Sequence, residues 1–554
     1  MIMQSSLLGA DTVNGRGRDW LILGSVLIAA GVLRLLLFNG FFGSDDVIYL
    51  ERSLAIAHGT WTSSDYIGSL RYGYNIPAAV PIWLFGLSPW SANLWSLICS
   101  LAEVAAVFIF MAAFIGRRAA VYAAVLLASA PLHIALATRI HADPVLACFL
   151  TLSFALFYAA ERGGCRRLYF LAGVAMGMVF WTKEFALITL LVFVTYPVVV
   201  RRWDPKWVWT LAGGAFMFAG HLLLMQVIAA DPLHVFRIVL TGVGGAGDVQ
   251  GAVSPSPWYY FSYLFLDIKH TFLLAYLSLA ALVLLPFRRR GATVESGSAM
   301  AVEAYIAWWL LGLLAVLSFL PLSLDPLLLV PKQTNYMNLF LAPMAMLAGA
   351  WLAALSRTAL RIGLLAAAAL GGVGLGVMEQ AAYQVFTANS KAVVELALAH
   401  PDALVVGSVN NVRMAGARSV LDGDPGLMER VVTFSEETKR QRATTAGGAA
   451  RVETLAIIDR ENQSWRPEAI VIDTVPGCWT KLEDLRPLGM GLGAQVVQGL
   501  RAILALLPAT LAQKLDGPLR QLVEPEVATV YRVDGESLWC GQAGPGTAGS
   551  PGRG

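Results

Sequence analysis

The sequence predicts a mainly α, polytopic helical membrane protein with a smaller α/β domain at its C-terminal end. Three observations support this fold class: the scarcity of charge, the positions of basic residues between apolar runs, and a change of pattern after Tyr383. Of the 554 residues, 57% are hydrophobic and 14% are charged, whereas soluble globular proteins have roughly 25% charged residues. The net charge of +3 is too small to indicate a nucleic-acid partner.

The apolar runs are long enough to cross a bilayer, which takes about 20 residues each. We expect about 11 to 13 spans in a membrane domain over residues 20–380. The runs lie near residues 20–38, 92–115, 118–138, 144–161, 168–185, 186–200, 207–229, 270–287, 303–321, 336–355 and 359–378. Residues 1–19 form a short cytoplasmic segment, and the run after them is interpreted as an uncleaved signal anchor.

The basic residues between the runs predict the orientation. They gather at Arg16/Arg18, Arg117/Arg118, Arg162/Arg166/Arg167, Arg201/Arg202/Lys206, Arg288/Arg289/Arg290 and Arg357/Arg361. With the expected spans, all these clusters fall on one face, which the positive-inside rule assigns to the cytoplasm. The other face receives the first external loop, residues 39–91, and everything after 379. We therefore expect a multi-pass protein of a bacterial inner (cell) membrane with its C-terminal domain on the periplasmic side.

After Tyr383 the apolar runs shorten to strand length. They lie at 403–407, 469–473 and 527–531, and helical patterns between them predict an extracytoplasmic α/β domain over residues 381–540. Residues 484–520 are rich in Leu and Gly and fit a helix that lies on the membrane. Cys478 and Cys540 would pair if this domain faces an oxidising compartment. The Gly/Pro/Ser-rich end, residues 541–554, is expected to be disordered.

An acidic pair, Asp45 and Asp46, follows the first apolar run directly. A carboxylate at the edge of a bilayer loses hydration unless it is paired, binds a cation or takes part in chemistry. One interpretation is structural: Ser44 or Asp45 caps the helix that starts at Val47. The other is catalytic: one carboxylate is a general base for an acceptor hydroxyl, and the other orients the site or holds a cation.

Further polar residues are expected on the same external face. Arg139, His141 and Asp143 form one group, although Asp143 before Pro144 is also a common helix start. Lys183 interrupts an apolar double span, where it would pair with Glu184, extend to the interface, or hold the phosphate of a lipid-linked donor.

Four further positions are candidates for substrate binding. Lys332 has the same alternatives as Lys183, and Tyr336 follows it in the segment that opens the tenth span. Arg71 and Tyr72, in the first external loop, are candidates for phosphate contact.

Taken together, these features resemble the GT-C superfamily of glycosyltransferases, most closely the branch of protein O-mannosyltransferases and lipid A aminoarabinose transferases. The resemblance covers about residues 20–380. In chain order, it is carried by Asp45 and Asp46, His141-Ala-Asp143-Pro144, the Gly-x-x-x-x-Thr-Lys segment from Gly177 to Lys183, Pro257 to Phe261, and Lys332, Tyr336 and Pro343. The tenth-span opening departs from the usual Arg-Tyr of this branch, because Asn335 precedes Tyr336 here.

The resemblance implies a polyprenyl-phosphate-linked sugar donor and transfer to a hydroxyl of a lipid, glycan or protein acceptor on the extracytoplasmic face. It implies that Asp45 or Asp46 is the base, that Asp143 helps bind substrate or metal, and that Lys183 and Arg71 contact the donor phosphate. A divalent cation held by Asp46 and Asp143 stays open. One displacement by an activated hydroxyl would invert the anomeric centre.

Two other functions remain as alternatives. A lipid-linked sugar flippase or other transporter needs charged residues deep in several spans, or repeats with broken helices, whereas the charges in this sequence concentrate at one membrane face. A catalytically silent membrane assembly protein would keep the fold and use its tail as a binding module. An O-antigen ligase, an enzyme of similar topology, typically carries its catalytic loop late in the chain.

Overall fold

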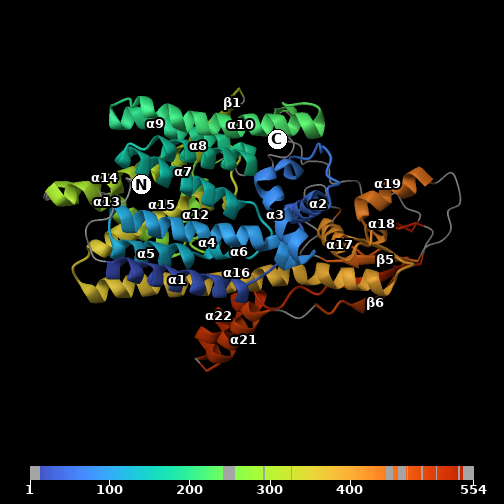
Figure 1. Cartoon of the computed structure of the whole chain (residues 1–554). Helices are drawn as coiled ribbons and strands as arrows, with labels where there is room; N and C mark the ends of the chain where they lie inside the picture. The colour runs from blue at the N-terminus through green and yellow to red at the C-terminus, as the bar shows by residue number, and fades with distance from the viewer. Residues whose placement is uncertain are drawn as a thin grey trace. The chain divides into compact units, whose positions relative to one another are not determined.

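The fold was analysed in a computed structural model, which describes residues 13–240, 256–290, 294–325, 327–444, 453–459, 470, 472–487, 491–506, 508–534 and 537–540. The chain divides into two compact units (Figure 1). The first unit consists of Met1–Phe38, Arg52–Gly86 and Trp90–Gly376. The second consists of Asn39–Glu51, Leu87–Pro89 and Val377–Gly554.

Helices dominate the first unit. Within the described residues, seven helices are long and apolar enough to cross a membrane, or eight if the bent pair α5–α6 counts as one span. Two other apolar helices, Leu187–Val200 and Leu273–Phe287, are shorter than a full span, and α8 has 17 residues. The predicted polytopic helical fold is confirmed, and several of the expected runs form helices shorter than a full crossing.

In chain order, the helical elements up to the shared helix α16 are α1 (Val13–Leu36), α2 (Asp45–Ala57), η1 (Ile67–Leu70), α3 (Tyr72–Phe85), α4 (Pro89–Phe114), α5 (Arg117–Ala128), α6 (Pro131–Ala137), α7 (Asp143–Gly163), α8 (Arg166–Thr182), η2 (Glu184–Thr189), α9 (Leu190–Val200), η3 (Pro205–Trp207), α10 (Val208–Ala229), α12 (Tyr259–Phe265), α13 (Leu273–Arg290), α14 (Val294–Phe319), η5 (Thr334–Met337), α15 (Asn338–Ala354) and α16 (Thr358–Ala399). Two short antiparallel strands, β1 (Pro321–Leu324) and β2 (Leu327–Leu329), precede η5.

Glycine allows α8 and α10 to pack backbone against backbone. A Cβ placed on Gly173 of α8 would lie 1.9 Å from the carbonyl oxygen of Thr210, and one on Gly213 of α10 would lie 2.0 Å from that of Phe170. Figure 1 shows the two helices side by side. Small residues at such contacts are typical of membrane helices, which cannot rely on a hydrophobic driving force between them.

A sharp bend separates α5 from α6. The two helices are inclined by 61°, and Pro131 stands in the first turn of α6, where its missing N–H removes no helix hydrogen bond. The next free N–H, of Leu132, donates to the carbonyl of His270 at 3.1 Å. The bend directs the chain into the loop that ends at Asp143.

A five-stranded mixed sheet forms the centre of the second unit. Its strands are β3 (Leu404–Gly407), β4 (Val431–Thr433), β5 (Thr454–Ile458), β6 (Trp479–Asp484) and β7 (Thr529–Val533). The order is β4-β3-β5-β7-β6. β3 pairs in parallel with β4 and β5, while β7 pairs antiparallel with β5 and β6.

Helices cover the sheet and lie beside it. They are the end of α16, then α17 (Val409–Asp422), α18 (Gly426–Arg430), α19 (Phe434–Thr444), α21 (Leu492–Leu504) and α22 (Ala509–Gln521). Along β5, Leu455 and Ile457 belong to one buried cluster, and Ala456 and Ile458 belong to another. This alternation is expected for a strand with both faces covered.

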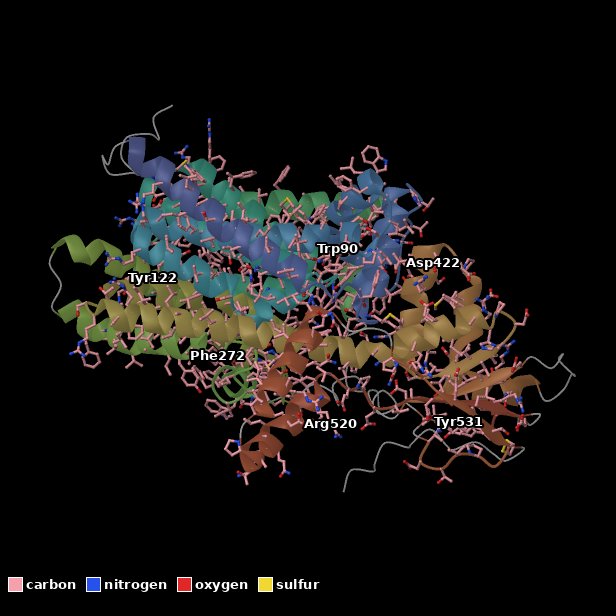
Figure 2. The ribbon with its side chains drawn as sticks, turned by 90° about the horizontal axis from the view of Figure 1, so that it is seen from below. Trp90, Tyr122, Phe272, Asp422, Arg520 and Tyr531 are labelled. Atoms are coloured by element: carbon pink, nitrogen blue, oxygen red, sulfur yellow. A yellow bond between two sulfur atoms is a disulfide. The ribbon has the colours of Figure 1, made fainter. Side chains whose placement is uncertain are left out.

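The C-terminal strands confirm part of the expected pattern. β3 falls within predicted 403–407, and β7 overlaps predicted 527–531 (Tyr531 is labelled in Figure 2). Of predicted 469–473, residues 469 and 471 lie outside the described part, while Ile470 and Ile472 are buried but belong to no strand. Cys478 and Cys540 form a disulfide. Residues 541–554 lie outside the described part.

Candidate functional site

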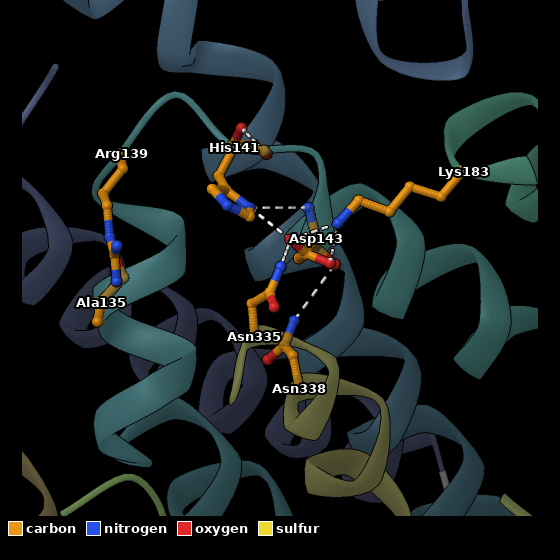
Figure 3. Close-up of polar contacts among 8 residues, drawn as sticks. Ala135, Arg139, His141, Asp143, Lys183, Asn335 and Asn338 are labelled. Carbon is orange, nitrogen blue, oxygen red and sulfur yellow. Dashed lines mark hydrogen bonds and ion pairs between the residues drawn. The ribbon is translucent and has the colours of Figure 1, made fainter. Parts of the chain in front are cut away.

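The candidate site of the first unit surrounds Asp143, the first residue of α7, whose side chain is buried. His141 Nδ1 lies 2.6 Å from one carboxylate oxygen, and Lys183 Nζ donates to both oxygens at 2.8 and 2.9 Å. Asn335 Nδ2 donates to the carboxylate at 2.9 Å, and Asn338 Nδ2 donates to the main-chain carbonyl of Asp143 at 3.3 Å (Figure 3). Side chains from distant parts of the sequence thus share one buried carboxylate.

Lys183 is fixed from two sides. It follows α8 directly, with an extended backbone. Its ammonium lies 5.0 Å from the centre of the Tyr336 ring, a distance at which the negative face of an aromatic ring attracts a cation. The structure therefore brings together four residues that the sequence assigns to the site: His141, Asp143, Lys183 and Tyr336.

Arg139 lies apart from this group. Its Nε donates to the carbonyl of Ala135 at 3.0 Å, and its side chain lies along α6 rather than among the side chains around Asp143 (Figure 3).

A stripe of buried polar residues on α4 holds the loop that carries these side chains. Asn93 Nδ2 donates to the carbonyl of Ala137 at 3.0 Å, and Ser96 Oγ donates to that of His141 at 2.8 Å. The first contact satisfies a carbonyl group that the end of α6 leaves without a helical partner, and the second satisfies a carbonyl group of the loop before α7. The loop position therefore depends on α4 as well as on its own sequence.

The same stripe continues into a buried ionisable network. Glu103 of α4 contacts His133 Nε2 at 3.2 Å and accepts from Thr151 Oγ1 at 2.9 Å. Arg34 of α1 contacts His133 Nδ1 at 2.7 Å and donates to Ser100 Oγ at 2.9 Å. All five side chains are buried. Glu103, in the interior of α4, is an exception to the sequence-based expectation that charge concentrates at one membrane face.

Arg71 and Tyr72 begin the segment that packs against the end of α8. Arg71 precedes α3, and the buried Tyr72 hydroxyl accepts from Arg52 at 2.8 Å. A Cβ on the following Gly73 would lie 2.5 Å from Thr182 Oγ1 and 2.7 Å from the Thr182 nitrogen. This close approach places the start of α3 beside the residue that precedes Lys183.

Lys332 is another buried cation of this unit. Its Nζ donates to the carbonyl of Val330 at 3.3 Å, and no carboxylate of the described residues lies within ion-pair distance of it. Burial lowers the pKa of Lys332 below its ordinary value of 10.5 because the charged form loses hydration. An anionic ligand would restore the missing counter-charge.

The acidic pair belongs to the second unit, in the first turn of α2. The Asp46 carboxylate accepts hydrogen bonds from the main-chain N–H groups of Phe42 at 2.6 Å, Gly43 at 3.1 Å and Ser44 at 2.5 Å. Asp46 is buried, whereas Asp45 is half-buried. The structural interpretation thus fits Asp46, although the sequence suggested Ser44 or Asp45 as the capping residue.

Neither acidic position has the ligand set of a divalent cation. Lys183, His141 and Asn335 already occupy the Asp143 carboxylate, and three N–H groups occupy that of Asp46. Within the described part of the chain, no group of three or more His, Cys, Asp and Glu side chains could hold a metal ion. Hard cations prefer several oxygen ligands, so neither carboxylate, as it is paired here, fits a divalent cation.

Sequence analysis missed several residues that build this site. Asn335 was noted for standing where the resembling enzymes have Arg, and its amide now binds Asp143. Asn335 and Asn338, three residues apart at the start of an apolar helix, are the signal that could have indicated a shared partner. Glu103 within the apolar helix α4 is a similar signal, because an ionisable residue inside a membrane helix usually has a function or a specific partner.

Comparison with known proteins supports one fold. Residues 78–224 match the family described as dolichyl-phosphate-mannose-protein mannosyltransferase. The sequence comparison with curated proteins gives no match. The crystal structure of ArnT from Cupriavidus metallidurans in the apo state is similar with a TM-score of 0.53 and 16% identity, over 81% of this chain and 94% of that one.

Two further structures are similar to this chain. ArnT from Cupriavidus metallidurans bound to undecaprenyl phosphate has a TM-score of 0.51 and 16% identity, again over 81% of this chain and 94% of that one. The apo oligosaccharyltransferase from Archaeoglobus fulgidus has a TM-score of 0.49 and 13% identity, over 79% of this chain and 69% of that one. The expected fold is confirmed: the chain has the GT-C membrane fold, and it resembles the branch of ArnT and the protein mannosyltransferases.

Proposed function

We propose that this chain transfers a hexosyl or pentosyl group from a polyprenyl-phosphate donor to a hydroxyl of a lipid, glycan or protein acceptor. The observation that carries the proposal is the group of buried side chains around Asp143 in a chain with the GT-C fold. ArnT from Cupriavidus metallidurans has been solved with undecaprenyl phosphate, which supports a polyprenyl-phosphate donor here.

The positions of the site residues at helix ends suit a lipid-linked donor. Asp143 opens α7, Lys183 follows α8, and Tyr336 shortly precedes α15. Such a donor keeps its tail in the bilayer and presents its phosphosugar at the interface. The leaving group is a phosphate, so the ammonium groups of Lys183 and Lys332 would stabilise the charge that develops on it.

The acidic turn, residues 42–46, contacts α16. The distance of this contact from Thr358, the start of α16, matches the thickness of a bilayer. Phe42 contacts Tyr383 and Phe386 of α16, with ring centres 4.7 and 5.0 Å apart. Tyr383 stands about 25 residues after Thr358, which at about 1.5 Å per residue corresponds to about 40 Å. A bilayer with its headgroups is about 40–45 Å thick, so the turn would lie in the headgroup layer.

In the proposed reaction, Asp45 is the base, because backbone groups occupy the Asp46 carboxylate. The acceptor hydroxyl oxygen bonds to the anomeric carbon as the bond from that carbon to the phosphate oxygen breaks. The hydroxyl proton passes to Asp45, and the bonding electron pair leaves with the polyprenyl phosphate. A single displacement of this kind inverts the anomeric centre.

The disulfide Cys478–Cys540 supports an extracytoplasmic position for residues 381–540, because disulfides persist mainly in oxidising compartments. We therefore propose that this part forms a periplasmic domain and that the acceptor reaches the site from that side of the inner membrane.

The test is mass spectrometry of envelope glycolipids and glycoproteins from a deletion strain that carries wild-type, Asp45→Asn or Asp65→Asn protein. Asp65, an exposed carboxylate of the same loop, is the matched control. We expect one sugar modification to vanish on deletion and to return with wild type and Asp65→Asn but not with Asp45→Asn. Full restoration by Asp45→Asn at normal protein levels would refute the assignment of the base.

A lipid-linked sugar transporter remains a second candidate, because the structure contains two features that are common in such proteins. These are the buried network of Arg34, Glu103 and His133 and the bent pair α5–α6. Purified protein in vesicles with a radiolabelled polyprenyl-phosphate sugar separates the two functions: a transferase forms a glycosylated product, whereas a transporter moves unchanged donor across the bilayer.

A further inference from the structure

Helices α21 and α22 form a hairpin in the second unit. The guanidinium of Arg501 joins them, because it donates to Asp516 of α22 at 2.7 Å and to Glu524 just beyond α22 at 2.7 Å. Arg520, labelled in Figure 2, lies near the end of α22 and pairs with Glu524 at 3.4 Å. The hairpin is therefore fixed internally by ion pairs on its polar side.

The hairpin is attached to α16 at a defined height. The main-chain nitrogens of Gly491 and Gly493 donate to the side chains of Gln384 at 2.7 Å and Gln380 at 2.8 Å. A Cβ on Gly493 would lie 2.7 Å from the carbonyl oxygen of Val377, so the two helices meet backbone to backbone. Figure 1 shows the pair beside α16.

The attachment point of the hairpin on α16 corresponds to the level at which α16 would leave a bilayer. The helix begins at Thr358, next to the basic Arg357 and Arg361. About 20 residues later, near Val377, it has risen about 30 Å, which is the thickness of the hydrocarbon core. With Thr358 at the opposite edge of the hydrocarbon core, the first residues of α21 would lie at the boundary between hydrocarbon and headgroups of the leaflet that α16 leaves.

One face of α21 is apolar and uncovered. Ala494 and Val497 are buried in a cluster with Ala381 of α16. Beside them on the same helix, a second apolar stripe is exposed: Leu492, Val496, Leu500 and Ile503. Ile503 is 62% exposed, and Leu506, just beyond the helix, is 85% exposed. The remaining face carries the exposed Gln495 and Gln498.

We propose that the α21–α22 hairpin is an interfacial membrane anchor whose apolar stripe inserts among the acyl chains of the leaflet that α16 leaves. An amphipathic helix with one apolar face and one polar face lies in the plane of the interface in this way. The occupant is lipid rather than a protein partner, because the attachment to α16 places the stripe at the depth where acyl chains begin.

The anchor gives the second unit a fixed height above the bilayer. Gln380 and Gln384, which hold α21, alternate along α16 with Tyr383 and Phe386, which contact Phe42 of the acidic turn. One short stretch of α16 thus carries both the anchor and the turn that contains Asp45. Insertion of the stripe would limit tilting of this stretch and keep the turn at the interface.

The test uses a nitroxide on the full-length protein in phosphatidylcholine/phosphatidylglycerol nanodiscs. The label is attached at Ile503→Cys, in a Cys165→Ser background, and Gln498→Cys on the polar face of α21 is the matched control. We expect collisions of the Ile503 label with oxygen to exceed those with a water-soluble nickel chelate severalfold, and the Gln498 label to show the reverse order.

Two results would overturn the anchor. Equal or greater access of the nickel chelate at Ile503 would place the stripe in water. Protection from both reagents would show that protein, such as a second copy of the chain, covers it. A second pair covers the case that the first label disturbs the helix. Val496→Cys, about two helical turns before Ile503, is compared with Gln495→Cys as its control.

Discussion

The ammonium of Lys183, at the end of α8, donates to both carboxylate oxygens of Asp143, at the start of α7, at 2.8 and 2.9 Å. Both side chains are almost completely buried. Because burial removes hydration from both charges, this pair contributes less to stability than its short distances suggest, while the loss of either partner leaves an uncompensated charge. The pair therefore fixes the relative position of two helix ends at the candidate site.

The first prediction concerns this ion pair. Lys183→Met and Asp143→Asn each leave one buried partner unpaired, and we expect each to destabilise the protein by about 3–5 kcal/mol. The double variant should recover part of this loss. A double-mutant cycle of thermal unfolding in detergent measures the coupling; purely additive effects would show that the two side chains do not interact in the folded protein.

The second prediction separates the two acidic residues of the turn. Asp46→Asn places an amide donor against three main-chain N–H groups and should cost about 1–3 kcal/mol of stability. Asp45→Asn should lose sugar transfer in protein that still folds, because it removes the proposed base. Thermal unfolding and transfer per folded molecule check both; an Asp46→Asn protein as stable as wild type would contradict the capping role.

The third prediction tests the close approach of α3 to α8. Gly73→Ala places a methyl group against the backbone of Thr182 and should destabilise the protein by about 1–3 kcal/mol and raise the KM for the donor, because Lys183 follows directly. Gly220→Ala is the control, since its Cβ would meet Trp181 at an ordinary 3.5 Å. Equal KM values for the two variants would disprove the positioning role.

The fourth prediction is a pH dependence of stability. Burial lowers the pKa of Lys332 below 10.5, so between the lowered value and 10.5 the folded protein binds fewer protons than the unfolded chain. The contribution of Lys332 to the free energy of unfolding therefore rises with pH in that window and is smallest below it. Relative to Lys332→Met, the wild-type unfolding midpoint should rise with pH in the window between the lowered pKa of Lys332 and 10.5.

The midpoint difference is measured across this range in the absence of any phosphate ligand. Asp325→Asn, a change between β1 and β2 shortly before Lys332, controls for general effects of alkaline pH. A difference that stays constant or falls with pH would show that Lys332 has no lowered pKa in the folded protein.

The fifth prediction concerns orientation. In intact spheroplasts, a membrane-impermeant maleimide should label Cys478 and Cys540 only after reduction of their disulfide. Cys165, between α7 and α8 in a basic loop, should be labelled only after the membrane is permeabilised. Labelling of Cys165 from outside would reverse the proposed topology and move Asp45 to the cytoplasm.

The sequence predicted the membrane fold and several site residues because both follow from local chemistry. Apolar length and the alternation of basic loops placed Asp143 and Lys183 on one face, and the structure shows them in contact. The contact itself was beyond the sequence, because residues 40 positions apart meet only through the packing of α7 on α8. Asn335 was similarly visible as a departure from the usual Arg but had no assignable partner.

The acidic pair shows a different limit of sequence analysis. A helix cap and a catalytic carboxylate use the same residue types, so Asp45 and Asp46 could not be separated by pattern. Gly43, with a φ of 80°, turns the backbone so that three N–H groups point toward Asp46. Gly43 also packs beside α17, where an added Cβ would lie 3.7 Å from Arg413 and Met414, a tertiary contact that the local pattern does not reveal.

The buried polar stripe of α4 has a consequence for biosynthesis. When α4 leaves the ribosome, α1 with Arg34 already exists, whereas α6 with His133 and α7 with Thr151 do not. Placing an unpaired carboxylate in hydrocarbon costs free energy. Glu103 must therefore enter the bilayer beside Arg34, or α4 must wait outside the bilayer until α6 and α7 have been made. Stable insertion of α4 therefore depends on α1. Because α1 is translated first, the positive charge of Arg34 is present before Glu103 is made.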